Sequence, residues 1–290
     1  MSILGLIWET PIGMESRHAE MPDRVKDTLD TKDTSDRIDP RYIVPGLSRG
    51  LAVLQLFPRS KPARTLAELA AGLGLSRSAT YRLVYTLEAD GFISRDSETR
   101  RYRLTSKTLD LGFEYLHAQP ITETAQPFLR ALSDRSNAAA HVAILDGWHA
   151  VYLARALPNA GLVSNLQLGA RLPAHTTSSG RIMLAFQDDA RLDEIYNKIK
   201  AERGGAIGRD EFTAQILADR KRGYVFHRST VDPGLVSLAF PVRDHDSHVV
   251  AAVTVIVPEK IANTMGGEKV FRPMVQETAD SISRKIGYRG

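Results

Sequence analysis

The 290-residue sequence contains no cysteine, and this absence excludes disulfide bonds, cysteine-ligated zinc and thiol catalysis. It also lacks an apolar run of about 18 residues, the length that a helix needs to cross a bilayer. The first 14 residues have no basic start and no small-residue cleavage site, so they make a poor secretory signal. These absences predict a cytoplasmic protein with no membrane partner.

Aromatic residues make up only 7% of the chain, whereas 43% hydrophobic and 25% charged residues are ordinary for a globular protein. The charge is unevenly distributed along the sequence. Residues 1–40 hold five basic and nine acidic residues, and we expect this stretch to be a poorly ordered extension. Residues 41–120 hold twelve basic and seven acidic residues, a local excess that is typical of a nucleic-acid-binding module.

Residues 65–104 predict a winged helix-turn-helix. Thr65 and Glu68 have the spacing of a capping box, in which each side chain reaches a backbone N–H at the start of a helix. The apolar residues that follow lie on one face at helical spacing: Leu66, Leu69, Ala70 and Leu73. A turn containing Gly72 and Gly74 separates this helix from a second one.

The second helix has the residues of a recognition helix on its outward face. Arginine pairs with guanine or phosphate, and hydroxyl groups donate to phosphate oxygens. The residues of this helix and its N-cap that we expect to contact DNA are Ser76, Arg77, Ser78, Thr80, Tyr81 and Arg82. The buried stripe of the same helix is expected at Ala79, Leu83 and Leu87.

Gly91 ends the second helix, and the alternating segment after it predicts a two-stranded hairpin, the wing, with its turn at residues 96–99. The wing residues expected to contact DNA are Arg95, Arg100 and Arg101. Arginines on an isolated hairpin are plain surface charges as often as they are DNA contacts. The agreement of caps, turn and hairpin favours the winged motif, so residues 41–105 are expected to form a DNA-binding domain.

Residues 106–120 predict a linker helix, and residues 121–290 predict an antiparallel sheet with helices packed around it, which makes the fold class α+β. Within this last domain, residues 176–179 place four hydroxyl groups at the start of a helix, with Gly180 allowing a close backbone approach. Free N–H groups and the positive end of the helix dipole attract an anion, so a carboxylate ligand is expected there. The competing interpretation is that these hydroxyls only cap the helix.

Two other interpretations are weaker. A hydrolase would use Ser178 or Ser179 with His175, but the sequence has no G-x-S-x-G elbow and these residues share one turn. A metal site would use the acidic and histidine side chains of residues 244–248, whose short polar pattern is more typical of a solvated hairpin turn. We therefore expect no catalytic residues, no metal and no cofactor.

Several segments resemble the IclR family of bacterial transcriptional regulators and occur in the family's order. They are SRGLAVLQLF, LAELAAGLGLSRSATYRLVYTLEADGFI, RRYRLT, LGARLPAHTTSSGRIMLA, RGYVF, DPGLVSLAFPV and VVAAVTVIV. The resemblance implies a winged DNA-binding domain, a linker helix and a GAF-like effector and oligomerisation domain over residues 121–290. It implies a regulator that binds a double-stranded DNA operator as a homodimer or homotetramer. The most similar branch regulates the catabolism of protocatechuate, 4-hydroxybenzoate and β-ketoadipate.

The resemblance also implies which residues bind the effector: Ser164, Leu166, Thr177, Ser178, Ser179, Val236, Ser237 and Thr254. The chain departs from the family at His227 and Arg228, where many members are acidic. If these side chains point inward, Arg228 can pair with a carboxylate and His227 can bond a phenol or a second acid. Ile256 is apolar where some members have a hydroxyl, which favours a carboxylated effector with an aromatic body.

Overall fold

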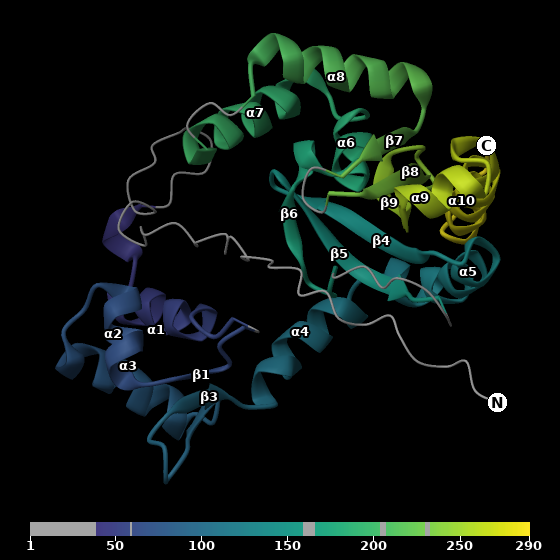
Figure 1. Cartoon of the computed structure of the whole chain (residues 1–290). Helices are drawn as coiled ribbons and strands as arrows, with labels where there is room; N and C mark the ends of the chain where they lie inside the picture. Colours follow the sequence, from purple (N-terminus) through teal and green to yellow (C-terminus); the bar gives the residue numbers. More distant parts are fainter. Residues whose placement is uncertain (1–38, 59, 159–165, 204–206, 230–232) are drawn as a thin grey trace, which may run out of the picture. The chain divides into compact units, whose positions relative to one another are not determined.

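The computed structural model describes residues 39–58, 60–158, 166–203, 207–229 and 233–290 (Figure 1). These residues form two compact units that divide after Leu111. The division lies inside helix α4 (Lys107–His117), within the segment that is predicted to be a linker helix. No helix in the described part of the chain has both the length and the apolar character needed to span a membrane.

The N-terminal unit packs helices against a small sheet. Its helices are η2 (Pro40–Tyr42), α1 (Pro45–Gln55), α2 (Leu66–Leu73) and α3 (Arg77–Ala89). Its strands are β1 (Ala63–Arg64), β2 (Ile93–Arg95) and β3 (Tyr102–Leu104), in the order β1-β3-β2. The expectation of a two-stranded wing is therefore incomplete, because β1 pairs with β3. A strand of two residues is too short to show an alternating pattern in the sequence.

Local caps fix the turn between α2 and α3. The capping box is present, since Glu68 N donates to Thr65 Oγ1 at 3.3 Å and Thr65 N donates to Glu68 Oε2 at 2.8 Å. Gly74 closes α2 in the left-handed conformation, with φ of 61°. Ser76 opens α3, with its Oγ accepting from Ala79 N at 3.2 Å. These caps pair backbone groups that a helix end otherwise leaves open.

The C-terminal unit is built on a six-stranded sheet. Its strands, in order across the sheet, are β6 (Arg171–Pro173), β5 (His149–Ala156), β4 (Ala139–Asp146), β9 (Val249–Pro258), β8 (Leu235–Arg243) and β7 (Val225–Arg228). All neighbouring strands of this sheet pair in the antiparallel sense. With helices around the sheet, the predicted α+β class is confirmed.

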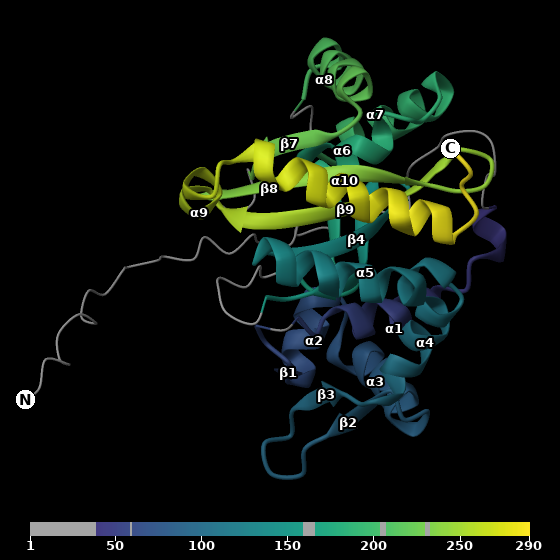
Figure 2. The ribbon, with the colours of Figure 1, turned by 90° about the vertical axis from the view of Figure 1, so that its right-hand side faces the viewer.

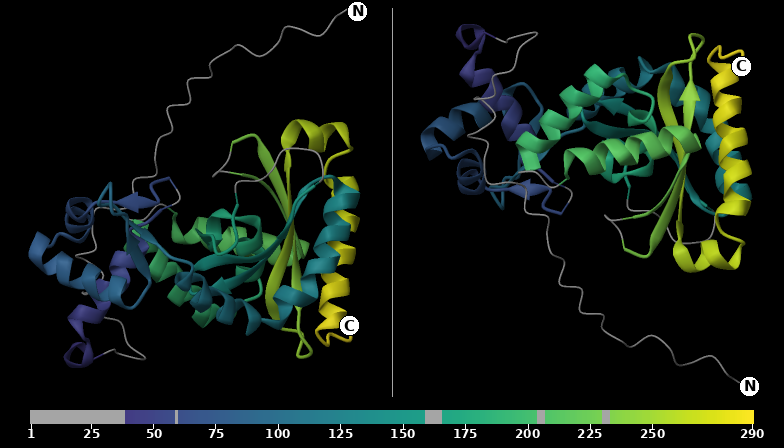
Figure 3. Two further views of the ribbon diagram at one scale, coloured as in Figure 1. Left: turned by 90° about the horizontal axis from the view of Figure 1, so that it is seen from below. Right: turned by 90° about the horizontal axis from the view of Figure 1, so that it is seen from above.

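Helices cover both faces of this sheet. Helices α5 (Pro120–Ser136) and α10 (Glu268–Lys285) lie side by side on one face (Figures 2 and 3). The other face carries η3 (Ala174–Thr176), α6 (Ser178–Leu184), α7 (Asp189–Arg203) and α8 (Arg209–Arg222), while α9 (Glu259–Thr264) follows β9. Buried side chains alternate between the faces. Leu238 and Phe240 join the core under α5 and α10, whereas Ala239 between them packs with residues of α6.

Gly180 lies where α6 approaches η3 most closely. A Cβ atom at this position would lie 2.2 Å from the backbone oxygen of Ala174 and 2.3 Å from its Cα. The close approach expected at Gly180 is therefore made by the chain's own backbone. Because both partners are main-chain atoms, no side chain can move aside, and glycine is the one residue that fits.

We expect Gly180→Ala to destabilise the protein by more than about 3 kcal/mol, because the added methyl overlaps backbone atoms in a packed core. The measurement is chemical denaturation followed by circular dichroism. The matched control is Gly112→Ala in α4, where no heavy atom lies within 4 Å of the added Cβ. That change should stabilise the helix by up to about 1 kcal/mol. Equal stabilities of the two variants would contradict the packing at Gly180.

Candidate functional site

The N-terminal end of α3 presents an exposed polar surface. Arg77, Tyr81 and Arg82 are exposed there, together with the N-cap Ser76 and its neighbour Ser78. Thr80 does not belong to this surface. Its side chain is 0% exposed, and its Oγ1 donates to the Ser76 carbonyl at 3.0 Å. The helix turns Thr80 and Val84 into the core, and Leu83 and Leu87 of the predicted stripe pack against that core as partly buried side chains.

The wing contains two kinds of arginine. Arg100 is exposed and lies at the turn with φ of 57°, and Arg95 stacks over the Tyr102 ring at 5.5 Å. Arg101 instead folds back toward α2. Its Nη1 lies 3.4 Å from Glu68 Oε2 and donates to the Ala63 carbonyl at 3.4 Å. Arg101 thus connects the wing to α2 through Glu68. Arg100 is more exposed and is the better placed of the two for a phosphate contact.

In the C-terminal unit, a cavity of about 310 Å³ opens between the start of α6 and the strands β5 to β9. We call it the α6 cavity. Its apolar wall includes Leu166, Leu172, Leu235 and Ile256, and its polar side includes Thr177, Ser178, His227 and Ser237. Tyr152 also lines it. Five residues expected to bind the effector are thus brought together: Leu166, Thr177, Ser178, His227 and Ser237.

The hydroxyls at the start of α6 are largely used by the protein itself. Thr177 caps the helix, with its Oγ1 accepting from Gly180 N at 3.0 Å. Ser178 Oγ lies 3.1 Å from Thr254 Oγ1. Since Thr254 Oγ1 donates its proton to the Leu238 carbonyl at 3.0 Å, Ser178 is the donor of this pair. The capping interpretation therefore accounts for much of the hydroxyl run, and α6 spans only seven residues.

The two serines proposed for a hydrolase also have other partners. Ser179 is fully buried, and its Oγ lies 3.5 Å from the Tyr152 hydroxyl. Ser178 bonds to Thr254, as described above. In the described part of the chain neither serine bonds to a histidine. Ser179 and Thr254 therefore lie in a buried polar layer around the α6 cavity, and the cavity lining itself includes neither of them.

Two expected effector residues, Val236 and Arg228, lie away from the cavity, and a third is outside the described residues. Val236 is buried in the core on the α5 and α10 face, because side chains of β8 alternate and Ser237 takes the cavity side. Arg228 does not point inward. Its side chain is 79% exposed, and its Nε donates to Glu259 Oε1 at 2.7 Å. Ser164 lies outside the described residues.

Sequence reasoning missed the charged pair beside the α6 cavity. Arg181, only 9% exposed, donates from Nε and Nη2 to the two carboxylate oxygens of Asp219, each at 2.8 Å. Burial raises the pKa of Asp219, and the Arg181 guanidinium opposes that shift. The remaining Nη1 of Arg181 lies 3.2 Å from His227 Nδ1. One signal was available: Arg181 is a charged residue inside an otherwise uncharged, buried helix.

Two histidines on this side of the sheet are held neutral. Burial, together with the Arg181 charge, lowers the pKa of His227. Its Nε2 is buried and has no hydrogen-bond partner among the described residues. His141 in β4 is 1% exposed, and burial lowers its pKa to about 3. Its ring meets Tyr152 edge-on, with 5.8 Å between centroids.

Comparison with known proteins matches both units to one family. The IclR helix-turn-helix domain matches residues 46–97, and the bacterial transcriptional regulator IclR C-terminal domain matches residues 113–284. The chain belongs to the IclR family. It is therefore a DNA-binding transcriptional regulator and not an enzyme, as the resemblance predicts.

Three IclR-family relatives are similar to this chain in sequence or in fold. The Pca regulon regulatory protein of Pseudomonas putida is 36% identical over 221 residues, which cover 75% of each chain. A crystal structure of a candidate transcriptional regulator from Rhodococcus sp. RHA1 is 33% identical, with a TM-score of 0.71 over 84% of this chain and 98% of that one. An IclR homologue from Microbacterium hydrocarbonoxydans, solved with 4-hydroxybenzoate, has the same fold at 20% identity, with a TM-score of 0.69 over 83% of this chain and 98% of that one.

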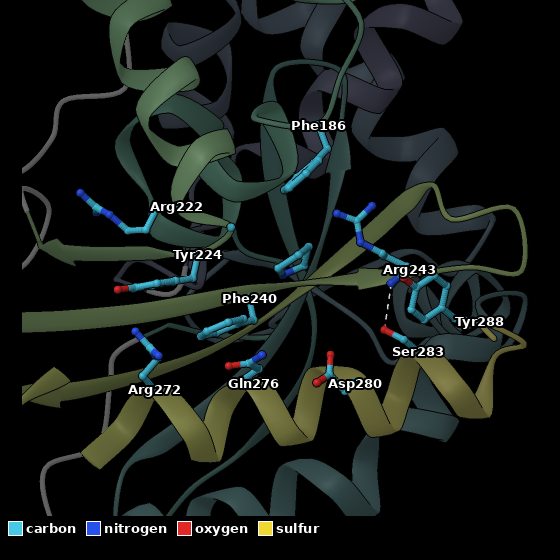
Figure 4. A pocket seen from close by; sticks show the side chains of 12 residues that line it. Phe186, Arg222, Tyr224, Phe240, Arg243, Arg272, Gln276, Asp280, Ser283 and Tyr288 are labelled. Carbon is cyan, nitrogen blue, oxygen red and sulfur yellow. Dashed lines mark hydrogen bonds between the residues drawn. The ribbon is translucent and has the colours of Figure 1, made fainter. Parts of the chain in front are cut away.

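A second cavity, of about 380 Å³, contains none of the effector residues expected for this IclR-family chain (Figure 4). Tyr224 and Phe240 stack in it with 5.2 Å between ring centroids, and α10 borders it through Arg272 and Asp280. Arg243 packs its guanidinium over Phe186 at 4.4 Å. These aromatic and charged groups already contact one another, so this cavity is the weaker candidate for the effector.

The acidic and histidine residues at 244–248 form a hairpin turn between β8 and β9. Asp244 Oδ1 accepts from the backbone N of Asp246 at 3.0 Å and of His248 at 2.9 Å. Such side-chain bonds to the following backbone are typical of polar turns. No metal-binding cluster of His, Asp and Glu is found among the residues that the structure describes.

We expect the unfolding free energy to decrease when the pH falls from 7 to 5.5, partly because of His141. Its pKa in the folded protein, about 3, lies below the ordinary value of 6.5. In this pH range the unfolded chain therefore binds a proton at His141 and the folded chain does not. The loss is about 1.4 kcal/mol per pH unit below about pH 6. Urea denaturation at fixed protein concentration measures it. His141→Leu should flatten the slope. Equal slopes in wild type and His141→Leu would exclude this role.

Proposed function

We propose that this regulator binds a small aromatic carboxylate in the α6 cavity and that the ligand changes its operator binding. The observation that carries the proposal is the combination of an apolar wall with a polar side on which His227 Nε2 is buried and unpartnered. A volume of about 310 Å³ lies at the small end of the range for ligand pockets. A flat ring against the wall, with an oxygen acceptor at His227, fits this chemistry.

The relatives support the same ligand class. The Pseudomonas relative is named for the Pca regulon, and the Microbacterium homologue was solved with 4-hydroxybenzoate. Within this proposal, the polar side consists of Thr177, Ser178, His227 and Ser237, with Leu166 and Ile256 against the ring. Arg228 is excluded as an anchor because it lies at the surface in an ion pair with Glu259.

The same proposal assigns operator contacts to α3 and the wing. Arg77 and Arg82 are exposed on α3 and are the candidates for base edges or phosphates. Arg100 at the wing turn is the candidate for a phosphate contact. Free regulator and operator would meet in the cytoplasm.

A homo-oligomer, either a dimer or a tetramer, is part of the proposal. Helix α4 exposes Leu109, Leu111 and Tyr115, and α1 exposes Leu47 and Leu51. Apolar side chains gathered on helices in this way are typical of surfaces that pack against another chain. A symmetric dimer would present two recognition helices to two operator half-sites.

We expect 4-hydroxybenzoate, protocatechuate or a related aromatic acid to raise the melting temperature. A ligand at 100 times its Kd stabilises the folded state by about 2.7 kcal/mol. Ile256→Asp should abolish the shift, because it places a second negative charge against the ring and the carboxylate. Arg228→Gln is the matched control and should keep it. The effector proposal fails if no aromatic acid stabilises the wild type, or if Ile256→Asp responds as the wild type does.

Arg77→Gln and Arg82→Gln should each weaken binding to an operator selected from a random-sequence DNA library by about 1 to 3 kcal/mol. The reason is the loss of a charged donor at the end of α3 that meets DNA. Fluorescence anisotropy at fixed salt measures the affinity, and circular dichroism checks the fold. Arg130→Gln on the exposed side of α5 is the control. If the two α3 variants bind as tightly as this control, the recognition-helix assignment is wrong.

A further inference from the structure

The Asp219–Arg181 pair lies next to His227, and the contact between Arg181 and the imidazole depends on which ring nitrogen carries the proton. Arginine has N–H donors and no acceptor, and it stays protonated in proteins. Its Nη1 lies 3.2 Å from His227 Nδ1, so this contact is a hydrogen bond only when Nδ1 offers its lone pair. A neutral imidazole that accepts at Nδ1 holds its proton at Nε2.

Arg181 has little freedom to turn away. Its Nε and Nη2 both donate to Asp219, so the planar guanidinium is held by two parallel bonds. The carboxylate belongs to α8 and the guanidinium to α6, and both side chains are buried. The Asp219 charge also balances Arg181, which therefore has no need of an anionic ligand. Of the three N–H groups that remain, one on Nη1 is directed to His227 Nδ1.

The second ring nitrogen of His227, Nε2, is the one that Arg181 does not contact. His227 is part of the cavity lining, and its Nε2 is buried without a hydrogen-bond partner among the described residues. The hydroxyls nearby already have partners of their own: Ser237 Oγ donates to the His227 carbonyl at 3.4 Å, and Ser178 donates to Thr254. An unpaired N–H at Nε2 is thus the fixed donor on this side of the cavity.

We propose that Asp219 and Arg181 act as positioning residues that lock His227 as the neutral Nε2–H tautomer, so that the α6 cavity selects effectors with an acceptor oxygen at this position. A carboxylate or carbonyl oxygen accepts from Nε2–H, whereas an ammonium group brings only donors and meets another N–H. This inference rests on the proposed function for the identity of the cavity. It adds that His227 selects for an acceptor group on the ligand. It also adds that Arg181 and Asp219 set the tautomer of His227.

The first experiment needs no ligand. Nitrogen-15 NMR of histidine-labelled protein at pH 7 distinguishes the tautomers, and the His227 signals are assigned from their loss in His227→Gln. We expect Nδ1 without a proton and Nε2 with one. Arg181→Lys should mix the two tautomers, because a single ammonium group cannot hold both Asp219 and Nδ1 in the same geometry. An Nδ1–H tautomer or a charged ring in the wild type overturns the inference.

The second experiment uses calorimetry with 4-hydroxybenzoate as the probe. The side-chain amide of Gln reaches the place of Nε2, whereas that of Asn stays near Nδ1. His227→Gln should therefore bind within about threefold of wild type, and His227→Asn should lose about tenfold or more, the loss of one charge-assisted hydrogen bond. 4-Hydroxybenzylamine, with an ammonium group in place of the carboxylate, should not compete.

The outcomes separate the two proposals. Binding of 4-hydroxybenzoate with equal affinity by wild type, His227→Gln and His227→Asn overturns the role of His227 and leaves the effector proposal standing. Absence of binding by any aromatic acid overturns the effector proposal, while the NMR result still decides the tautomer. If Arg181→Lys keeps a single Nε2–H tautomer, the positioning role of Arg181 is wrong.

Discussion

The alternation of side chains along a sheet that is covered on both faces is the constraint on which the C-terminal unit depends. On β8, Val236 and Leu238 enter the core under α5 and α10, and Ser237 between them faces the α6 cavity. A strand buried on both sides has no water for its polar side chains, so each one needs a partner. Thr254 finds the Leu238 carbonyl, and Ser178 finds Thr254. His227 Nε2 is buried without a partner among the described residues, and the proposed function places an acceptor oxygen of the ligand there.

The Asp219–Arg181 pair has to be explained by something other than stability. Removing two charges from water costs free energy that their attraction often only balances, and apolar replacements of such pairs are frequently as stable. What the pair provides here is geometry. It connects α8 to α6 and directs one guanidinium N–H toward His227. The result is a histidine in the lining of the α6 cavity whose neutral state and tautomer are both set by fixed neighbours.

The parts of the fold that sequence reasoning predicted well depend on local signals. The capping box at Thr65, the cap at Ser76 and the winged order of helices and strands involve residues only a few positions apart. The α+β class follows from the order of strand-like and helical segments. On α3, Leu83 and Leu87 pack against the core as predicted, but Thr80 is buried as well, because its hydroxyl bonds to the Ser76 carbonyl. A polar residue with an internal partner cannot be distinguished from a surface residue by composition.

The effector site was predictable only in part for a different reason. Of the residues expected at the start of α6, Thr177 and Ser178 line the cavity and Ser179 does not. The hydroxyls of Thr177 and Ser178 bond to the protein itself. The sequence left open whether Arg228 points inward, and its ion pair with Glu259, a residue 31 positions away, holds it at the surface. Arg181 and Asp219 are 38 positions apart on different helices. No local pattern connects such residues, and their pairing follows from the packing of α6 against α8.

The connection between the two units bears on how a ligand in the α6 cavity would change operator binding. A ligand shifts DNA affinity only by as much as it binds one conformation of the protein better than another. Tyr152 in β5 lines the cavity, and α5 packs on β4 and β5 on the opposite face of the sheet. Helix α5 continues directly from α4, which crosses the division between the two units. Helix α4 is thus the covalent connection between the sheet and the DNA-binding unit. It is also the helix whose exposed apolar residues are the proposed contact with a second copy.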